Sequence, residues 1–217
     1  MLIAEDPAMD IAPAPPPARP WPGDRAGALD ALLSRRSCPP RLLSDPAPSD
    51  DHLRLMVEAA VRAPDHAGLR PWRFICIQDA ARVRLGGALA TAYMCRHRSA
   101  SRDQLDRERM KPLRAPMVLA VAAAVTLGHP RGTVMDQQLA AGAAAMNLLN
   151  VAHVLGYGGI WLTGESCHDA NIKRALGLAP GDFIAGWLYL GTPSGDPAPV
   201  RRPGTDDVLR HWTGLPA

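Results

Sequence analysis

The part of the chain that decides the fold reads Arg62-Ala63-Pro64-Asp65-His66-Ala67-Gly68-Leu69-Arg70-Pro71-Trp72-Arg73-Phe74. A helix is expected before it, because Ser49 can cap a first turn and apolar residues then recur at helical spacing. Pro64 ends that helix, since the residue before a proline avoids the helical region. Pro71 sets the chain extended for a strand over 72–78. The polar loop between these elements is typical of a binding loop, and a polar connection without function explains it too.

Composition places the chain among globular proteins. A length of 217 residues suits a single domain with a sizeable core. The four cysteines show no CxxC spacing, which argues against a secreted disulfide scaffold and makes a reducing cytoplasm the simplest location. The net charge of +3 is small and the arginines are scattered, so nucleic-acid binding gains no support.

The N-terminal segment and the most apolar window carry no targeting signal. Residues 1–10 hold three acids and no basic residue, unlike a signal peptide. The window 139–162 contains Asn147, Asn150 and His153, too polar for a bilayer-spanning helix, so no membrane partner is expected. We divide the chain into a Pro/Ala-rich extension over 1–24, a domain over 25–203 and a tail over 204–217. The extension reads as a passive tail more readily than as a proline-recognition segment.

Hydrophobic patterning outlines the rest of the domain. It predicts helices over 25–35, 80–97, 135–157 and 169–176, and strands over 116–122, 160–164 and 183–191. Small residues in the helix over 135–157 let a second helix approach closely, which suits a core or an interface. The segment 98–109 is strongly charged, with little apolar content, and is predicted to be a solvated, mobile excursion.

Two local groups suggest a ligand. Arg35-Arg36-Ser37 ends the first helix, and guanidinium groups match phosphate oxygens, although basic residues there also answer the helix dipole. Gly156, Gly158 and Gly159 precede a strand, where they would let backbone approach a flat ligand; a structural helix C-cap explains Gly156 or Gly158 equally well.

The usual catalytic motifs are missing. There is no GxGxxG after a strand and no phosphate-binding GxxxxGK[ST] loop. The histidines lack metal-ligand spacing, so no metal is expected, and Cys167-His168 has no supporting motif for nucleophilic catalysis. Anion-binding arginines, a polar loop and a glycine-flanked strand remain. Together they suit a bound organic cofactor that carries its own reactivity.

These pieces resemble the nitroreductase family of FMN-dependent oxidoreductases, and most closely its compact subgroup with a Pro-Asp-His loop. The matching segments lie in the family's order between residues 26 and 203 and are Arg35-Arg36-Ser37, Arg62 to His66, Arg70 to Phe74, Gly158 to Trp161, and Leu188 to Pro193. The resemblance implies an α+β three-layer sandwich with a mainly antiparallel central sheet flanked by helices. It also implies an obligate homodimer with active sites at the subunit interface, for which the helix over 135–157 suits the core.

The resemblance also implies roles for single residues. Arg35 and Ser37 would hold the FMN phosphate, completed by Arg201 or Arg202, while Arg36 would reach the ribityl chain or the ring edge. From the other subunit, the cofactor would be covered by Arg62, Pro64, Asp65 and His66. The residues beside the isoalloxazine would be Trp161, Leu162, Thr163 and Gly164. No side chain need act as acid or base, because the flavin carries the chemistry.

The implied activity is ping-pong transfer of hydride from NADH or NADPH through FMN to an electron-poor small molecule such as a nitroaromatic or a quinone. Alternatives are a flavin-fragmenting enzyme of the same superfamily, which consumes reduced FMN and oxygen, and a flavin-binding module without turnover. Gly68-Leu69 offers no amide side chain where many relatives place an asparagine. The segment 98–109, which shapes the substrate pocket in relatives, matches no known pattern, so the physiological substrate and the nicotinamide preference stay open.

Overall fold

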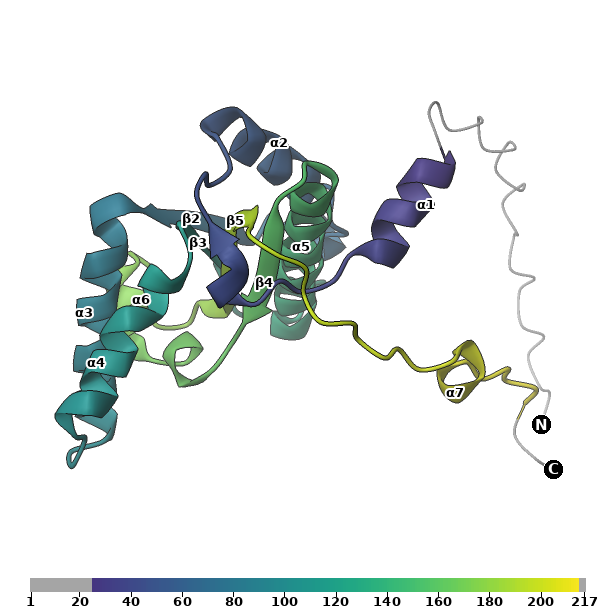
Figure 1. Cartoon of the computed structure of the whole chain (residues 1–217). Helices are drawn as coiled ribbons and strands as arrows, with labels where there is room; N and C mark the ends of the chain where they lie inside the picture. The colour runs from purple at the N-terminus through teal and green to yellow at the C-terminus, as the bar shows by residue number, and fades with distance from the viewer. Residues whose placement is uncertain (1–24, 215–217) are drawn as a thin grey trace, which may run out of the picture.

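The computed structural model describes residues 25–214 and shows an α+β protein (Figure 1). The extension predicted over 1–24 lies outside the described residues. The strands are β1 (Leu43–Ser44), β2 (Trp72–Gln78), β3 (Met117–Ala123), β4 (Gly158–Leu162) and β5 (Phe183–Pro193). The helices are α1 (Arg25–Ser34), α2 (Asp50–Ala60), α3 (Asp79–Arg96), α4 (Arg102–Met110), α5 (Val134–Val154), α6 (Ala170–Ala175) and α7 (Thr205–Val208). Within this part of the chain, no helix has the length and apolarity needed to cross a bilayer.

The five strands form one antiparallel sheet in the order β1-β5-β3-β2, with β4 also paired to β5. β1 and β4 share one edge of β5: β1 pairs with residues 192–193 and β4 with residues 187–191. β5 is therefore long enough, at 11 residues, to hold two short strands end to end. The antiparallel sheet confirms the predicted arrangement.

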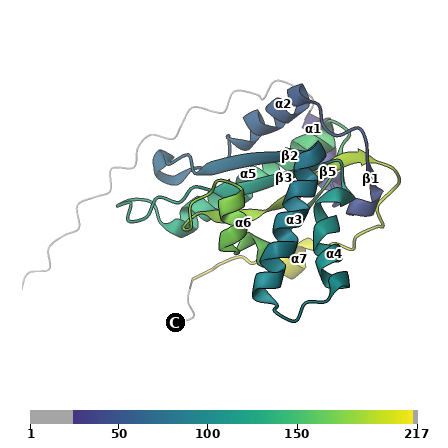
Figure 2. The same cartoon turned by 90° about the vertical axis from the view of Figure 1, so that its left-hand side faces the viewer.

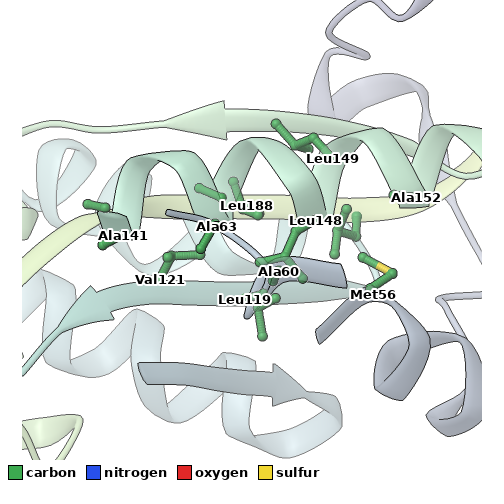
Figure 3. Close-up of a cluster of buried hydrophobic side chains, with 14 of the residues drawn as sticks. Met56, Ala60, Ala63, Leu119, Val121, Ala141, Leu148, Leu149, Ala152 and Leu188 are labelled. Carbon is green, nitrogen blue, oxygen red and sulfur yellow. The ribbon is translucent and has the colours of Figure 1, made fainter. Parts of the chain in front are cut away.

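Two hydrophobic clusters, one on each face of the sheet, account for the three-layer arrangement. Every residue of β3 is buried, as its near-continuous apolar run predicts. Leu119 and Val121 belong to a cluster with α2 and α5 (Figure 3). Val118 and Ala120 belong to a second cluster, with side chains of α3 and α6. Alternate residues of one strand thus pack against opposite helical layers, which Figure 2 shows on the two sides of the sheet.

Helix α5 is the longest element and ends at a glycine cap. Thr133 and Asp136 form a capping box at its start. At its end Gly156 has φ +85° and the Tyr157 amide donates to the Ala152 carbonyl at 2.8 Å. This is the Schellman arrangement, so the structural explanation of Gly156 holds.

The excursion predicted over 98–109 is instead regular structure, mostly helix α4. Ser101 and Gln104 form a capping box at its start, and Glu108 is buried. The helix lies against α3 (Figure 2), where Gly86 permits the approach: a Cβ atom there would lie 2.2 Å from the Arg109 carbonyl oxygen. Because this packing uses backbone and a paired acid, hydrophobic periodicity gave no sign of it.

Candidate functional site

Two cavities lie at the two ends of strand β4. The cavity at its start, here called the arginine cavity, has a volume of about 160 Å³ and is bordered by Gly158 and Gly159. The cavity at its end, here called the tyrosine cavity, has a volume of about 260 Å³ and is bordered by Leu162, Thr163 and Gly164. A strand rises about 3.3 Å per residue, so β4 separates the cavities by roughly 13 Å of backbone.

The arginine cavity gathers positive charge from distant parts of the chain. Arg35 and Arg36 follow α1, and His153 comes from the last turn of α5. Burial, and then the positive charge of Arg202, lowers the pKa of Arg35. Burial, and then Arg35, lowers the pKa of His153. Arg202 therefore lies within electrostatic reach of Arg35, and the four side chains suit an anionic ligand.

Backbone pairing with β4 holds the arginines in place. The Cys38 amide donates to the Gly159 carbonyl at 2.9 Å, which ties the segment after α1 to this strand. Arg36 also pairs with Asp196 at 3.4 Å, but the Asp196 side chain is 99% exposed. An exposed pair of this kind contributes little, so Arg36 stays available to an anion.

The glycines at the start of β4 serve packing. A Cβ atom at Gly158 would lie 2.7 Å from Leu43 Cδ2, and one at Gly159 would lie 2.8 Å from Leu149 Cδ2. These positions let α5 and the β1 segment approach β4. The idea that they open the backbone to a flat ligand gains no support from this geometry.

The tyrosine cavity has aromatic walls and a charged rim. Trp187 and Tyr189 of β5 lie in it together with Tyr93 of α3. Its charged residues are Arg96, Glu108, Lys111, Arg114 and Glu165. Burial raises the pKa of the Tyr189 hydroxyl, so this side chain presents a neutral phenol.

The charged groups at the rim of the tyrosine cavity differ in the partners that they contact. Glu108 Oε1 accepts from Lys111 Nζ at 2.5 Å, and Arg96 pairs with Glu165 and Asp169. The Arg114 guanidinium lies 5.6 Å from the centre of the Tyr189 ring, within the range of a cation–π interaction. The cavity therefore combines a flat aromatic wall with a positive edge.

The residues predicted to flank a flavin ring divide between the two faces of the sheet. Leu162, Thr163 and Gly164 line the tyrosine cavity. Trp161 points to the opposite face, where it lines an apolar hollow of about 490 Å³ beside Met135 and Leu139 of α5. Its indole Nε1 donates to the Ala185 carbonyl at 3.0 Å.

The Pro-Asp-His loop lies apart from both cavities within this chain. Arg62, Pro64, Asp65 and His66 line neither of them. The Asp65 carboxylate accepts from the amides of Leu69 at 3.1 Å and Arg70 at 2.7 Å, while Arg62 pairs with Glu58. Asp65 thus shapes its own loop. Among the remaining predicted residues, Ser37, Arg201 and Arg202 are exposed and line neither cavity.

Sequence reasoning missed most of the residues that the structure brings to the cavities, among them Tyr157 and His153 at the arginine cavity and Glu108 and Lys111 at the tyrosine cavity. Their placement depends on tertiary packing. For the second pair, a signal existed in the spacing of an acid and a base three residues apart, which is typical of one helix face.

Comparisons with known proteins find solved structures of similar fold. A Desulfovibrio desulfuricans structure described as "a putative nitroreductase in complex with fmn" is 28% identical, with a TM-score of 0.63, and the match covers 86% of this chain and 98% of that one. A nitroreductase-like protein from Bacillus cereus has a TM-score of 0.71 at 23% identity, covering 86% and 96% of the two chains; this likeness concerns the fold alone.

Sequence comparisons extend the match. The Escherichia coli K12 protein named "Putative NAD(P)H nitroreductase YdjA" is 36% identical over 169 residues, which cover 76% of this chain and 88% of that protein. The family model described as "Nitroreductase family" matches residues 32–192. Because these matches span most of the chain and include β4 with the elements around it, the protein belongs to the nitroreductase family.

Proposed function

We propose that this protein is an FMN-dependent oxidoreductase that uses NADH or NADPH to reduce a small electron-poor acceptor, such as a nitroaromatic or a quinone. The observation that carries the proposal is the pair of cavities at the ends of β4. One is lined by guanidinium groups and suits a phosphate, whereas the other is larger, aromatic and positively edged and suits an isoalloxazine ring. Bound FMN would supply the hydride transfer, and the chain would supply position and electrostatics.

The arginine cavity would hold the phosphate. Arg35 and Arg36 already lie in it, and Arg202 is close enough to lower the pKa of Arg35. A phosphate between these groups would relieve the mutual repulsion of the two guanidinium groups. Charge-assisted hydrogen bonds to phosphate are the strong ones, so this end would dominate retention of the cofactor.

The tyrosine cavity would receive the ring. Gly164 has φ +141° and nothing within 4 Å of the position of a Cβ atom, so its backbone is accessible from the cavity. Lys111 and Arg114 would place positive charge at the ring edge and favour negative charge there. The buried Glu108 would fix the direction of the Lys111 ammonium through their 2.5 Å contact.

A homodimer would complete the site. Apolar side chains are exposed on α1, including Leu33 at 82%, and on α5, including Leu139 at 65%. The C-terminal segment carrying α7 leads away from the sandwich on the side of α1 (Figure 1), and Trp212 there is 83% exposed. Large exposed apolar surfaces mark interaction sites. A second copy packed against α5 and along the sheet edge formed by β4 would bring its own Pro64 to His66 loop over the cofactor.

The decisive experiment follows the visible absorption of the purified protein. The protein is incubated with FMN, desalted, and titrated anaerobically with NADH or NADPH before an acceptor is added. We expect a flavin band that survives desalting, bleaches with the nicotinamide and returns with nitroaromatic or quinone.

The same experiment separates the alternatives. Loss of the flavin band on desalting would contradict the cofactor assignment. A retained band that neither nicotinamide bleaches would indicate a binding module without turnover. Chromatography of the extracted flavin after turnover with oxygen gives the third outcome, because destruction of FMN would indicate a flavin-fragmenting enzyme instead.

A further inference from the structure

We infer that His153 is an additional ligand of the FMN phosphate, neutral in the free protein and protonated when the phosphate binds, so that FMN affinity depends on pH. The inference rests on the proposed function. It adds one ligand and a pH dependence to the cavity proposed for the FMN phosphate. It concerns a side chain that the sequence patterns did not single out.

The imidazole of His153 lines the cavity that is proposed to hold the FMN phosphate. His153 occupies the last turn of α5 and lines the arginine cavity with Arg35 and Arg36. Its Nε2 atom is 3.0 Å from the Ser34 hydroxyl. The other titratable or charged groups around the cavity are Cys38, Tyr157, Asp196 and Arg202.

Electrostatics decide the protonation state. Burial, followed by the positive charge of Arg35, lowers the pKa of His153 and favours the neutral ring. A phosphate ester carries a charge of about −1.5 to −2 at neutral pH. Placed between the guanidinium groups, it would offset the repulsion from Arg35 and favour an imidazolium that donates to it.

The Ser34 hydroxyl permits both states of the ring. A hydroxyl can donate to the neutral Nε2 atom or accept from its protonated form. The 3.0 Å contact can therefore persist while the proton is taken up. Proton uptake on binding makes the dissociation constant rise with pH between the pKa values of the free and the loaded protein.

The FMN phosphate also titrates, and its titration makes the dissociation constant fall, not rise, as the pH increases. Its second pKa lies near 6, so the dianion, which binds arginine more tightly, gains population as the pH rises. A variant without the imidazole retains this contribution. The difference between wild type and variant therefore isolates the effect of His153.

The experiment measures flavin fluorescence quenching between about pH 5.5 and 8.5 for the wild type, His153→Gln and the matched control His168→Gln, whose histidine is exposed and lines neither cavity. At about pH 6 we expect His153→Gln to bind FMN about tenfold more weakly than the wild type, and at about pH 8.5 within about twofold. Riboflavin lacks the phosphate, and its affinity should not distinguish the three proteins.

A second measurement keeps the inference testable if the variant folds poorly. The His153 ring protons in the wild-type NMR spectrum, assigned with His153→Asn, should show a pKa raised by FMN by about one unit or more and unchanged by riboflavin. Parallel FMN profiles for wild type and variant, or a pKa that FMN leaves unchanged or lowers, would overturn the role of His153 while the proposed function stands. Wild-type protein that binds no FMN at any pH would overturn both.

Discussion

The indole of Trp161 occupies the space beside Gly186, where a Cβ atom would lie 2.1 Å from Nε1. Gly186 sits where the pairing of β5 with β3 shifts register, and the indole donates to the neighbouring Ala185 carbonyl. This contact directs Trp161 to the α5 face. Since side chains alternate along a strand, Leu162 then faces the tyrosine cavity. A backbone irregularity in β5 thus decides which residue of β4 reaches the candidate cofactor site.

Replacing Gly186 with alanine should destabilise the fold. The added methyl group would also meet the Leu162 carbonyl oxygen at 2.8 Å, and overpacking of this kind costs about 1–3 kcal/mol. Urea denaturation measures the loss. Gly181→Ala is the matched control, because nothing lies within 4 Å of its Cβ position. Equal stability of the two variants would show that β4 and β5 can separate at little cost.

Replacing Arg35 with alanine should weaken FMN binding by about one to two decades, because a phosphate contact from a charged group is worth about 1.5–3 kcal/mol. Equilibrium binding of FMN and of riboflavin measures the effect, and only FMN should be affected. Arg54→Ala, on the exposed face of α2, is the control. Unchanged FMN affinity in Arg35→Ala would remove the phosphate assignment of the arginine cavity.

Much of the fold could be predicted from the sequence because apolar runs and capping residues determine the structure of the segment that contains them. The apolar run at β3 indicates a strand buried on both faces, and Ser49 caps α2 as expected, with its side chain accepting from the His52 amide at 3.2 Å. Helix α4 was not predicted because its apolar content is low and its packing against α3 depends on the close backbone approach at Gly86. No periodicity in a sequence reports that kind of close backbone approach.

The candidate site is harder to foresee because its parts meet only in the fold. Arg35 was visible as a basic residue at a helix end, whereas His153 reaches it from more than a hundred residues away. The direction of Trp161 depends on the bulge at Gly186. A glycine inside a strand run can signal a bulge, but it does not tell which side chain of another strand fills the space beside it. The role of Asp65 in its own loop likewise depends on amides four and five residues later.

Replacing Asp65 with alanine should loosen the Pro-Asp-His loop. Its carboxylate accepts from two backbone amides in a segment where Ala67, Gly68 and Arg70 all have positive φ. The Leu69 amide is half-buried whereas the Arg70 amide is exposed. Leaving the half-buried donor unpaired costs about 1–3 kcal/mol, which thermal or urea unfolding would detect. Asp65→Asn retains one acceptor oxygen, so its stability should lie between that of the wild type and that of Asp65→Ala. A variant Asp65→Ala as stable as the wild type would mean that solvent replaces the carboxylate.

The flavin-free protein should lose stability on the acid side through His153. Its pKa in the fold lies below the ordinary value of 6.5, so between these two values the unfolded chain binds more protons than the folded one. The free energy of unfolding then decreases as the pH falls through 6.5 toward the lowered value. Denaturant unfolding at several pH values should show a smaller acid loss for His153→Gln. The same pH dependence in both proteins would contradict the assigned pKa direction.

Replacing Leu139 with arginine should disrupt the proposed homodimer and its cofactor site together. Leu139 is 65% exposed and Met135 is 67% exposed in the hollow beside Trp161, so burying them against a second copy would remove apolar surface from water, whereas a guanidinium there would be buried unpaired. Sedimentation velocity should show a monomer, and desalting should strip its FMN.

The control for this experiment is Val83→Arg, which adds the same charge to α3 at a side chain that is 61% exposed. α3 packs in the helical layer opposite α5, so this variant should remain dimeric and keep its flavin. A Leu139→Arg protein that sediments as the wild type does would place the interface elsewhere. A monomer that still retains FMN would show that one chain holds the cofactor by itself, and the Pro-Asp-His loop would then lose its proposed role.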